Sequence, residues 1–83
     1  MKKYLVDVYL PAAGEHFDVR LPTGKRVREA VELLGLLAEP LTNGNYQPGS
    51  SSMLLDAQTG QQLPMDVTVH DAGVRNASRL ILV

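Results

Sequence analysis

The chain closes on four large apolar residues in a row, Leu80, Ile81, Leu82 and Val83, and this run constrains the fold more than any other stretch. Successive side chains of a β-strand point to opposite sides of the sheet, so a strand that buries one face alternates apolar and polar residues. An unbroken apolar run therefore predicts a strand that turns half of its apolar side chains toward the core. The other half points away from the core, so these apolar side chains are expected at the surface of the protein.

One small core has to accommodate this strand. Eighty-three residues predict a single domain over residues 1–83, and a chain of that length buries only about 60% of its unfolded surface. An apolar content of 45% and a charged content of 20% are typical of globular proteins. The sequence has no cysteine, which excludes disulfides, thiol catalysis and thiolate metal sites. We therefore expect packing to hold the core.

The charge balance and the start of the sequence exclude several classes of partner. A net charge of -1 lacks the positive field that nucleic-acid binding requires. Asp7 interrupts the apolar run after Lys2 and Lys3, and no small-residue cleavage pattern follows, so we expect no signal peptide. No stretch approaches the roughly 18 apolar residues of a membrane-spanning helix. We expect a cytoplasmic protein that binds no nucleic acid and does not insert into a membrane.

Two segments near the start alternate apolar and polar residues, one over residues 4–10 and one over residues 15–21. Pro11 ends the first segment, and the turn-rich residues 11–14 join it to the second. The segments predict a β-hairpin with one face in water. The apolar positions of the hairpin are Tyr4, Val6, Val8, Leu10, Phe17, Val19 and Leu21.

Residues 25–38 predict a helix that lies on the sheet. Thr23 is placed to cap its N-terminus, and Glu39 and Pro40 end it. Residues 40–52 are dense in proline, glycine, asparagine and serine, so we expect an irregular loop there. The apolar stripe of the helix, at spacings of three and four, comprises Val27, Ala30, Val31, Leu34, Leu37 and Ala38.

The remaining segments supply the other strands of the sheet. Residues 53–57 have an extended pattern, and residues 61–65 predict only a short edge strand stopped by Pro64. A hairpin followed by a helix returns its next strands to the same sheet, and residues 80–83 close it. The predicted class is α+β, with one helix on one face of a mixed sheet of four or five strands. Within it, the residues expected in the core include Phe17, Val19, Leu34 and Leu80, whereas Ile81 is expected outside it.

This order of elements resembles that of ubiquitin-like β-grasp proteins over nearly the whole chain. The stretch TGQQLPMDVTVHDAGVRNASRLILV (59–83) resembles the family's course from a turn, through a Gln-Leu edge strand and a knot around an aspartate, to a Leu-x-Leu closing strand. Such a pattern specifies fold better than function. The matching positions are Gln62, Leu63, Val69, Asp71, Gly73, Val74, Leu80 and Leu82.

Within that superfamily the chain is most similar to the YukD-type branch, small bacterial proteins associated with type VII (WXG100) secretion. The similarity lies in FDVRLPTGKRVREAVELL (17–34) and VHDAGVRNASRLILV (69–83). That branch usually has Gly-Asp before the Arg-Leu of its last strand, where this chain has Ala77 and Ser78. The resemblance implies a protein that is not an enzyme.

Conjugation to other proteins and sulfur carriage both require a flexible C-terminal Gly-Gly whose carboxylate can be adenylated. This chain ends on β-branched and aliphatic strand residues. We therefore expect no conjugation.

The sequence offers no catalytic, cofactor-binding or metal-binding set. His16 and His70 stand alone, without a histidine three or four residues away or a glycine-rich phosphate loop. We interpret both as solvent-facing polar residues. Asp71 is interpreted as structural, bonding backbone amides of a turn in which Gly73 takes a positive φ.

The strongest candidate for function is the outward apolar set. If the closing strand lies beside the first strand, these side chains share the sheet face that points away from the helix, and contiguous apolar patches are rare on monomers. Cover by the loop over 40–52 and burial in a homodimer are the alternatives to a docking surface for a protein partner. Leu54 or Leu55 completes the set, and Leu55 is assigned to it. The predicted patch comprises Leu5, Tyr9, Leu55, Ile81 and Val83.

A secondary candidate is the basic first turn of the helix. Lys25, Arg26 and Arg28 oppose the helix dipole, and Glu29 and Glu32 offset part of that cost. A broken local rule can mark function, here a dock for an acidic partner surface. A solvated helix end that the fold tolerates is the alternative.

Two hypotheses about function follow. The first is a non-enzymatic interaction module, an accessory component of type VII secretion that binds a protein partner through its sheet face. The second is a small auxiliary subunit of a multicomponent enzyme, since ubiquitin-like subunits also occur in bacterial diiron monooxygenases. A modifier or sulfur carrier is disfavoured by the missing Gly-Gly.

Overall fold

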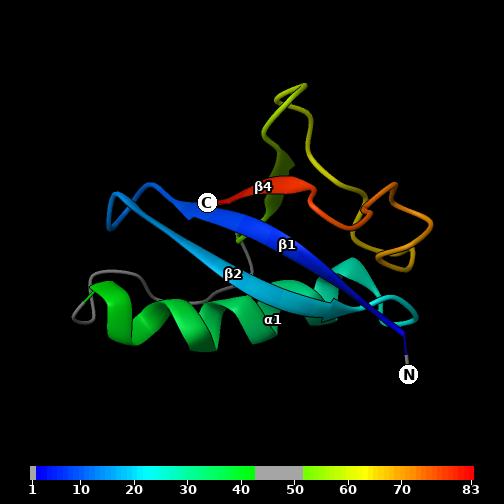
Figure 1. The fold of residues 1–83 in the computed structure, drawn as a ribbon, viewed down its shortest axis with the longest axis horizontal. Helices are drawn as coiled ribbons and strands as arrows, with labels where there is room; N and C mark the ends of the chain where they lie inside the picture. Colours follow the sequence, from blue (N-terminus) through cyan, green and yellow to red (C-terminus); the bar gives the residue numbers. More distant parts are fainter. Residues whose placement is uncertain (1, 43–51) are drawn as a thin grey trace.

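A single helix covers one face of a four-stranded sheet in the computed structural model, which describes residues 2–42 and 52–83 (Figure 1). The sheet contains parallel and antiparallel pairs, and the predicted α+β class is confirmed. Residues 43–51, most of the predicted loop over 40–52, lie outside the described residues. The elements in chain order are β1 (Lys3–Leu10), β2 (Glu15–Pro22), α1 (Val27–Ala38), the 3₁₀ helix η1 (Glu39–Thr42), β3 (Leu54–Asp56) and β4 (Arg79–Leu82).

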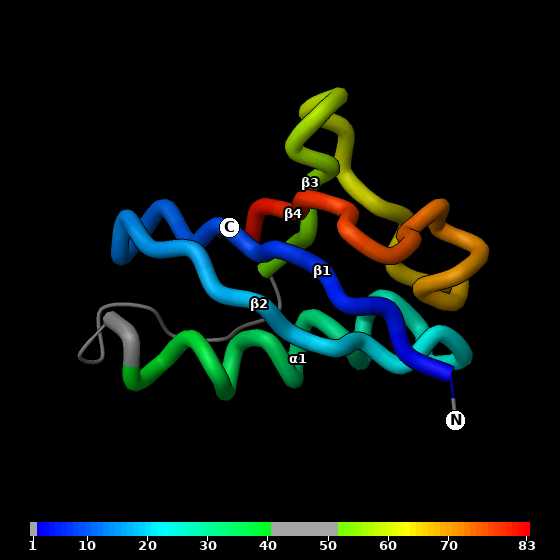
Figure 2. Tube along the Cα trace, in the orientation of Figure 1, coloured from blue at the N-terminus to red at the C-terminus, as the bar shows by residue number. Residues whose placement is uncertain are grey.

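The closing strand β4 is an inner strand of the sheet. The strand order is β2-β1-β4-β3, with β4 parallel to β1 and antiparallel to β3. Figure 2 shows β4 in red between β1 in blue and β3 in green. Val83 continues the ladder, because its N–H donates to the Met53 carbonyl and its carbonyl accepts from the Met53 N–H, both at 3.0 Å. Strands on both sides therefore hold β4 in place.

The core lies between the sheet and α1. In β4, Leu80 and Leu82 are buried while Ile81 is half-buried, and Val83 is exposed. The predicted division of the closing strand between two faces is therefore confirmed. The buried apolar residues are Tyr4, Val6, Val8, Leu10, Leu21, Val27, Ala30, Val31, Leu34, Ala38, Leu54, Leu63, Val69, Val74, Leu80 and Leu82.

The edge strand β2 is less buried than the sequence predicts. Phe17 and Val19, expected in the core, are half-buried and pack against the core from its margin. The reason is the strand order, which gives β2 a neighbouring strand on its β1 side alone. Only Leu21, near the end of β2, is fully buried.

The start of α1 is capped by a distant backbone segment, and the predicted Thr23 cap is wrong. The residue before the helix makes no side-chain capping bond. Instead the N–H groups of Val27 and Arg28 donate to the carbonyls of Val67 (2.9 Å) and Met65 (3.1 Å). These bonds satisfy two of the four amides that a helix start leaves without an intrahelical partner.

The buried stripe of α1 is narrower than predicted. Leu37, expected in the stripe, is 44% exposed. Each residue along a helix is rotated by about 100° from the one before it, so Leu37 lies on the flank of the helix while Leu34 and Ala38 face the sheet.

The predicted strand over residues 61–65 does not form. An isolated bridge between Leu55 and Gln62 takes its place.

Two aspartates lie opposite each other on the outer face of the hairpin. Asp7 of β1 is paired in register with Asp18 of β2. The Nδ1 of His16 lies 3.2 Å from Oδ2 of Asp7. Like charges directly opposite each other in an antiparallel pair are destabilising, so we expect the Asp7–Asp18 pair to lower the free energy of unfolding.

We predict that the two faces of β4 differ in their contribution to stability. Leu80→Ala should cost about 2–5 kcal/mol, because it leaves a cavity in the core. Ile81→Ala should cost no more than about 1.5 kcal/mol, because its side chain is only partly buried and its loss leaves no cavity in the core. Urea denaturation of both variants measures the difference, and equal losses of midpoint would show that both faces are buried.

We also predict that Asp18→Asn stabilises the protein by about 0.2–1 kcal/mol at low salt, because it removes the like-charge pair. The gain should shrink at about 1 M salt, where charges are screened beyond roughly 3 Å. Glu15→Gln is the matched control, since it removes one negative charge from the same strand opposite the apolar Leu10. Thermal unfolding in which both variants gain equally would mean that net charge, and not the Asp7–Asp18 pair, sets the effect.

Candidate protein-interaction surfaces

The outer face of the sheet carries one row of residues that crosses all four strands. Tyr9 of β1 is in register with His16 of β2 on one side and with Ile81 of β4 on the other. Ile81 is in turn opposite Leu55 of β3. Tyr9, Ile81 and Leu55 are all half-buried. Three of the predicted patch residues therefore lie side by side.

The cluster extends toward the end of β4. Val83 is 42% exposed, and its backbone partner Met53 is half-buried on the same face as Leu55. Leu54 is buried, so the structure assigns the outward position to Leu55 and confirms that choice. The sequence analysis missed Met53, although period two from Leu55 points to it. We call Tyr9, Met53, Leu55, Ile81 and Val83 the apolar cluster.

Leu5 is separated from the apolar cluster. The next row across the sheet consists of Asp18, Asp7 and Arg79, which are in register on β2, β1 and β4. Leu5 is 47% exposed and lies beyond this charged row, opposite Arg20. The structure therefore brings four of the five predicted patch residues together and leaves Leu5 apart.

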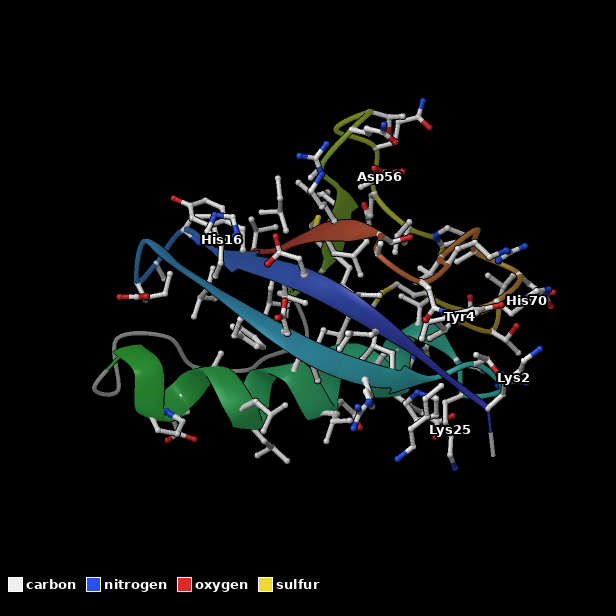
Figure 3. The ribbon with its side chains drawn as sticks, in the orientation of Figure 1. Lys2, Tyr4, His16, Lys25, Asp56 and His70 are labelled. Carbon is white, nitrogen blue, oxygen red and sulfur yellow. The ribbon has the colours of Figure 1, made fainter. Side chains whose placement is uncertain are left out.

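His16 forms the polar margin of the apolar cluster. Its ring packs against the ring of Tyr9, with centroids 4.6 Å apart and planes tilted by 37°. The same ring contacts the Asp7 carboxylate, so His16 joins the apolar row to the charged row. Figure 3 shows His16 on the side of the sheet that faces away from α1.

The three cations predicted in the first helical turn are largely neutralised within the chain, and only Arg28 lies in α1, because the helix begins at Val27 and not at Lys25. Lys25 and Glu29 form an ion pair at 3.7 Å, as their spacing predicts. Arg28 forms an ion pair with Asp66. Arg26 is exposed, and its backbone bridges to Thr68. Two of the three predicted cations therefore already have acidic neighbours.

His70 is exposed, as predicted, and it also takes part in a polar contact within the chain. Its Nδ1 shares a hydrogen bond of 2.7 Å with the hydroxyl of Tyr4, and the two rings stack with centroids 6.0 Å apart (Figure 3). Arg75 donates to the His70 carbonyl at 2.8 Å, and its guanidinium carbon lies 5.9 Å from the centre of the Tyr4 ring. The contact ties the start of β1 to the segment before β4.

The turn after His70 is closed by Thr68. The Asp71 N–H donates to the Thr68 hydroxyl at 3.0 Å, so the side chain that binds the turn amide is that of Thr68 and not of Asp71. Gly73 has the predicted positive φ, at 94°.

The described residues, 2–42 and 52–83, contain no group of three histidines, cysteines, aspartates or glutamates able to hold a metal ion. Within the same residues, no helix is long and apolar enough to cross a membrane.

A cleft of about 320 Å³ lies beside the segment that precedes β4, and its lining includes Ser78 and Asp56 but no histidine. The Ser78 hydroxyl accepts a hydrogen bond from the Arg75 N–H at 2.9 Å. This cleft therefore lacks the histidine base that would activate a serine nucleophile.

A second apolar surface, which the sequence analysis missed, lies on α1. Leu33, Leu36 and Leu37 are 40%, 65% and 44% exposed. Beside Leu33 is a small notch whose other lining residues are Pro22, Lys25, Glu29 and Ala30. A signal was present in the sequence, because four leucines in five positions (33–37) cannot all face one sheet. We call the three exposed leucines the leucine ridge.

Comparisons with known proteins place the chain by its fold. No protein-family model matches the sequence, and no curated protein matches it significantly. Two type VII secretion domains match in structure. The ubiquitin-like domain of EccD5 from Mycobacterium xenopi has a TM-score of 0.76 at 17% identity, covering 100% of this chain and 94% of that one. The ubiquitin-like domain of EccD1 from Mycobacterium tuberculosis has a TM-score of 0.66 at 20% identity, covering 100% and 99%.

A chain from a different kind of assembly matches equally well. It comes from a toluene 4-monooxygenase HD complex, with a TM-score of 0.76 at 13% identity, covering 99% of this chain and 98% of that one. Identities this low establish the fold and not the function. The chain therefore has the ubiquitin-like β-grasp fold.

Proposed function

We propose that this chain is a non-enzymatic, cytoplasmic interaction module of a bacterial type VII (WXG100) secretion system, of the YukD type. In this role it docks a protein partner through the apolar cluster. The observation that carries the proposal is the placement of Tyr9, Ile81 and Leu55 in one outward row on adjoining strands. The structural likeness to two EccD ubiquitin-like domains supports the secretion context.

The apolar cluster has the composition of a docking surface. An aromatic residue and four aliphatic or thioether side chains form its centre, and His16, Asp7 and Arg79 form a polar margin. Interfaces commonly combine an apolar centre with a polar rim, and tyrosine is enriched among hot-spot residues. At about 25 cal/mol per Å², covering even a few hundred Å² is worth several kcal/mol before the costs of association. A partner therefore gains affinity by covering this face.

A role in binding fits the polar groups of the chain better than catalysis does. Tyr4 with His70, and Tyr9 with His16, are engaged with each other as structural pairs. The Arg28–Asp66 and Lys25–Glu29 ion pairs lie at the surface. Chemistry would require a nucleophile or acid–base pair in a recess. The cleft beside Ser78 has no histidine, and the Oδ1 of its one carboxylate, Asp56, accepts a hydrogen bond from the Gln58 N–H at 2.8 Å.

One observation favours a second candidate function. The matching chain in the toluene 4-monooxygenase complex is covered to 98%, so a protein of this fold and size is part of a multicomponent oxygenase. On that candidate the chain is a small auxiliary subunit, again binding protein through a surface. The identity of the partner separates the two candidates, because secretion components support the first and oxygenase components the second.

We predict that Ile81→Glu and Tyr9→Glu each weaken partner binding by about 2 kcal/mol or more, roughly thirtyfold, as hot-spot substitutions do. The circular dichroism of the folded protein should stay the same, because both side chains are on the outer face. Co-purification from the native host, followed by titration with the captured partner, measures the effect.

Leu5→Glu is the matched control, because Leu5 is on the same face but separated from the cluster by the charged row. It should change binding little, as should reversal of charge at Lys25 and Arg26. If only the Lys25 and Arg26 reversal abolished binding, the basic first turn would be the interface and the proposed role of the apolar cluster would be wrong.

A further inference from the structure

The leucine ridge lies on the side of the molecule opposite the apolar cluster. One face of the sheet is covered by α1 (Figure 1). The ridge residues Leu33, Leu36 and Leu37 are exposed and are not among the buried residues of the helix that pack on the sheet. The apolar cluster lies on the other face of the sheet. Of the five large hydrophobic residues exposed in the described part of the chain, the ridge supplies three. The ridge is therefore a second apolar surface, separate from the first.

The spacing of the ridge fits a helical partner. Leu33, Leu36 and Leu37 follow the i, i+3, i+4 pattern, which makes a ridge along one side of a helix. Such ridges pack into the grooves between side chains of another helix. The notch beside Leu33 adds a recess whose apolar wall is Pro22 and Ala30 and whose rim is the Lys25–Glu29 ion pair.

Acidic residues predominate beside the ridge, where Lys25 lines the notch next to Leu33 together with Glu29. Glu29 and Glu32 each lie four residues before a ridge leucine, and Glu39 lies three residues after Leu36. Glu29 is paired with Lys25, whereas no ion pair in the described residues involves Glu32. The last turn of α1 contains no basic residue. A partner that covers the leucines thus brings its own flanking charges close to carboxylates.

We propose that the leucine ridge docks an amphipathic helix of a partner protein, with leucine or isoleucine anchors flanked by lysine or arginine. Charges that flank an apolar seam between two helices select the partner, and acidic flanks favour a basic one. The chain then links two partners, one on the apolar cluster and one on the ridge. This inference is independent of the secretion or oxygenase role.

A second copy of this chain fits the ridge less well. Two copies of α1 packed antiparallel about the middle of the ridge would bring Glu32 of each copy close to Glu39 of the other. Like charges placed together across an interface disfavour that pairing. The charge pattern therefore selects a basic partner over a homodimer.

The test uses a synthetic amphipathic peptide of about three heptads, with leucine at the a and d positions and lysine at the e and g positions. A second peptide carries glutamate in place of lysine. Both are titrated into the isotopically labelled full chain, and amide chemical shifts are followed by NMR. We expect the basic peptide to shift the amides of residues 33–38 and the acidic peptide to leave them in place.

Two variants make the result specific to the ridge. Leu36→Lys should weaken binding of the basic peptide by about tenfold or more, because it removes the most exposed anchor and adds a repelling charge. Leu5→Lys, an equal change on the other face, should weaken it less than about twofold. Equal binding of both peptides, shifts confined to the apolar cluster, or no effect of Leu36→Lys would each overturn the proposal. So would a dimer of the free chain in light scattering that Leu36→Lys abolishes, because the occupant would then be a second copy.

Discussion

The pairing of β4 with strands on both sides is the interaction on which the rest of the structure depends. β4 forms a parallel ladder with β1 and an antiparallel ladder with β3, so it joins the N-terminal hairpin to the later part of the chain. A parallel pair needs a crossover, and here the helix is part of the connection that covers the sheet. Because successive side chains of β4 point to opposite faces of the sheet, Leu80 and Leu82 are buried under the helix while Ile81 is on the outer face.

The same constraint creates both candidate surfaces. A sheet covered by one helix has one free face, and two inner strands place their outward apolar residues at its centre. A twelve-residue helix buries only the arc that faces the sheet, which leaves the leucine ridge outside. Each surface is bordered by charge: the apolar cluster by the row of Asp7 and Arg79, and the ridge by Glu32. Opposite sides of a small domain can thus receive different partners.

The sequence predicted the fold where a local pattern determines the outcome, and it failed where the outcome depends on distant residues. Period two determines the face of each residue in β4, and that division was correct. Thr23 is suited to capping a helix, but the Val67 carbonyl accepts the hydrogen bond from the first helical amide, that of Val27. Val67 lies 40 residues further along the chain, so the sequence around Thr23 does not predict this bond. The exposure of Leu37 depends on where the helix lies relative to the sheet. The separation of Leu5 from the cluster depends on the register across three strands, which places a charged row between them.

Native-state hydrogen exchange tests the central role of β4 most directly. If β4 holds the two parts of the sheet together, the amides of Ile81 and Leu82 exchange only through global unfolding, because β4 is bonded on both sides and its loss would open the core. Their free energies of exchange should equal those of Val6 and Val8 in β1 and the global free energy of unfolding. Exchange of the β4 amides at a free energy well below that of the β1 amides would contradict this, since β4 would then detach while the rest of the fold stayed intact.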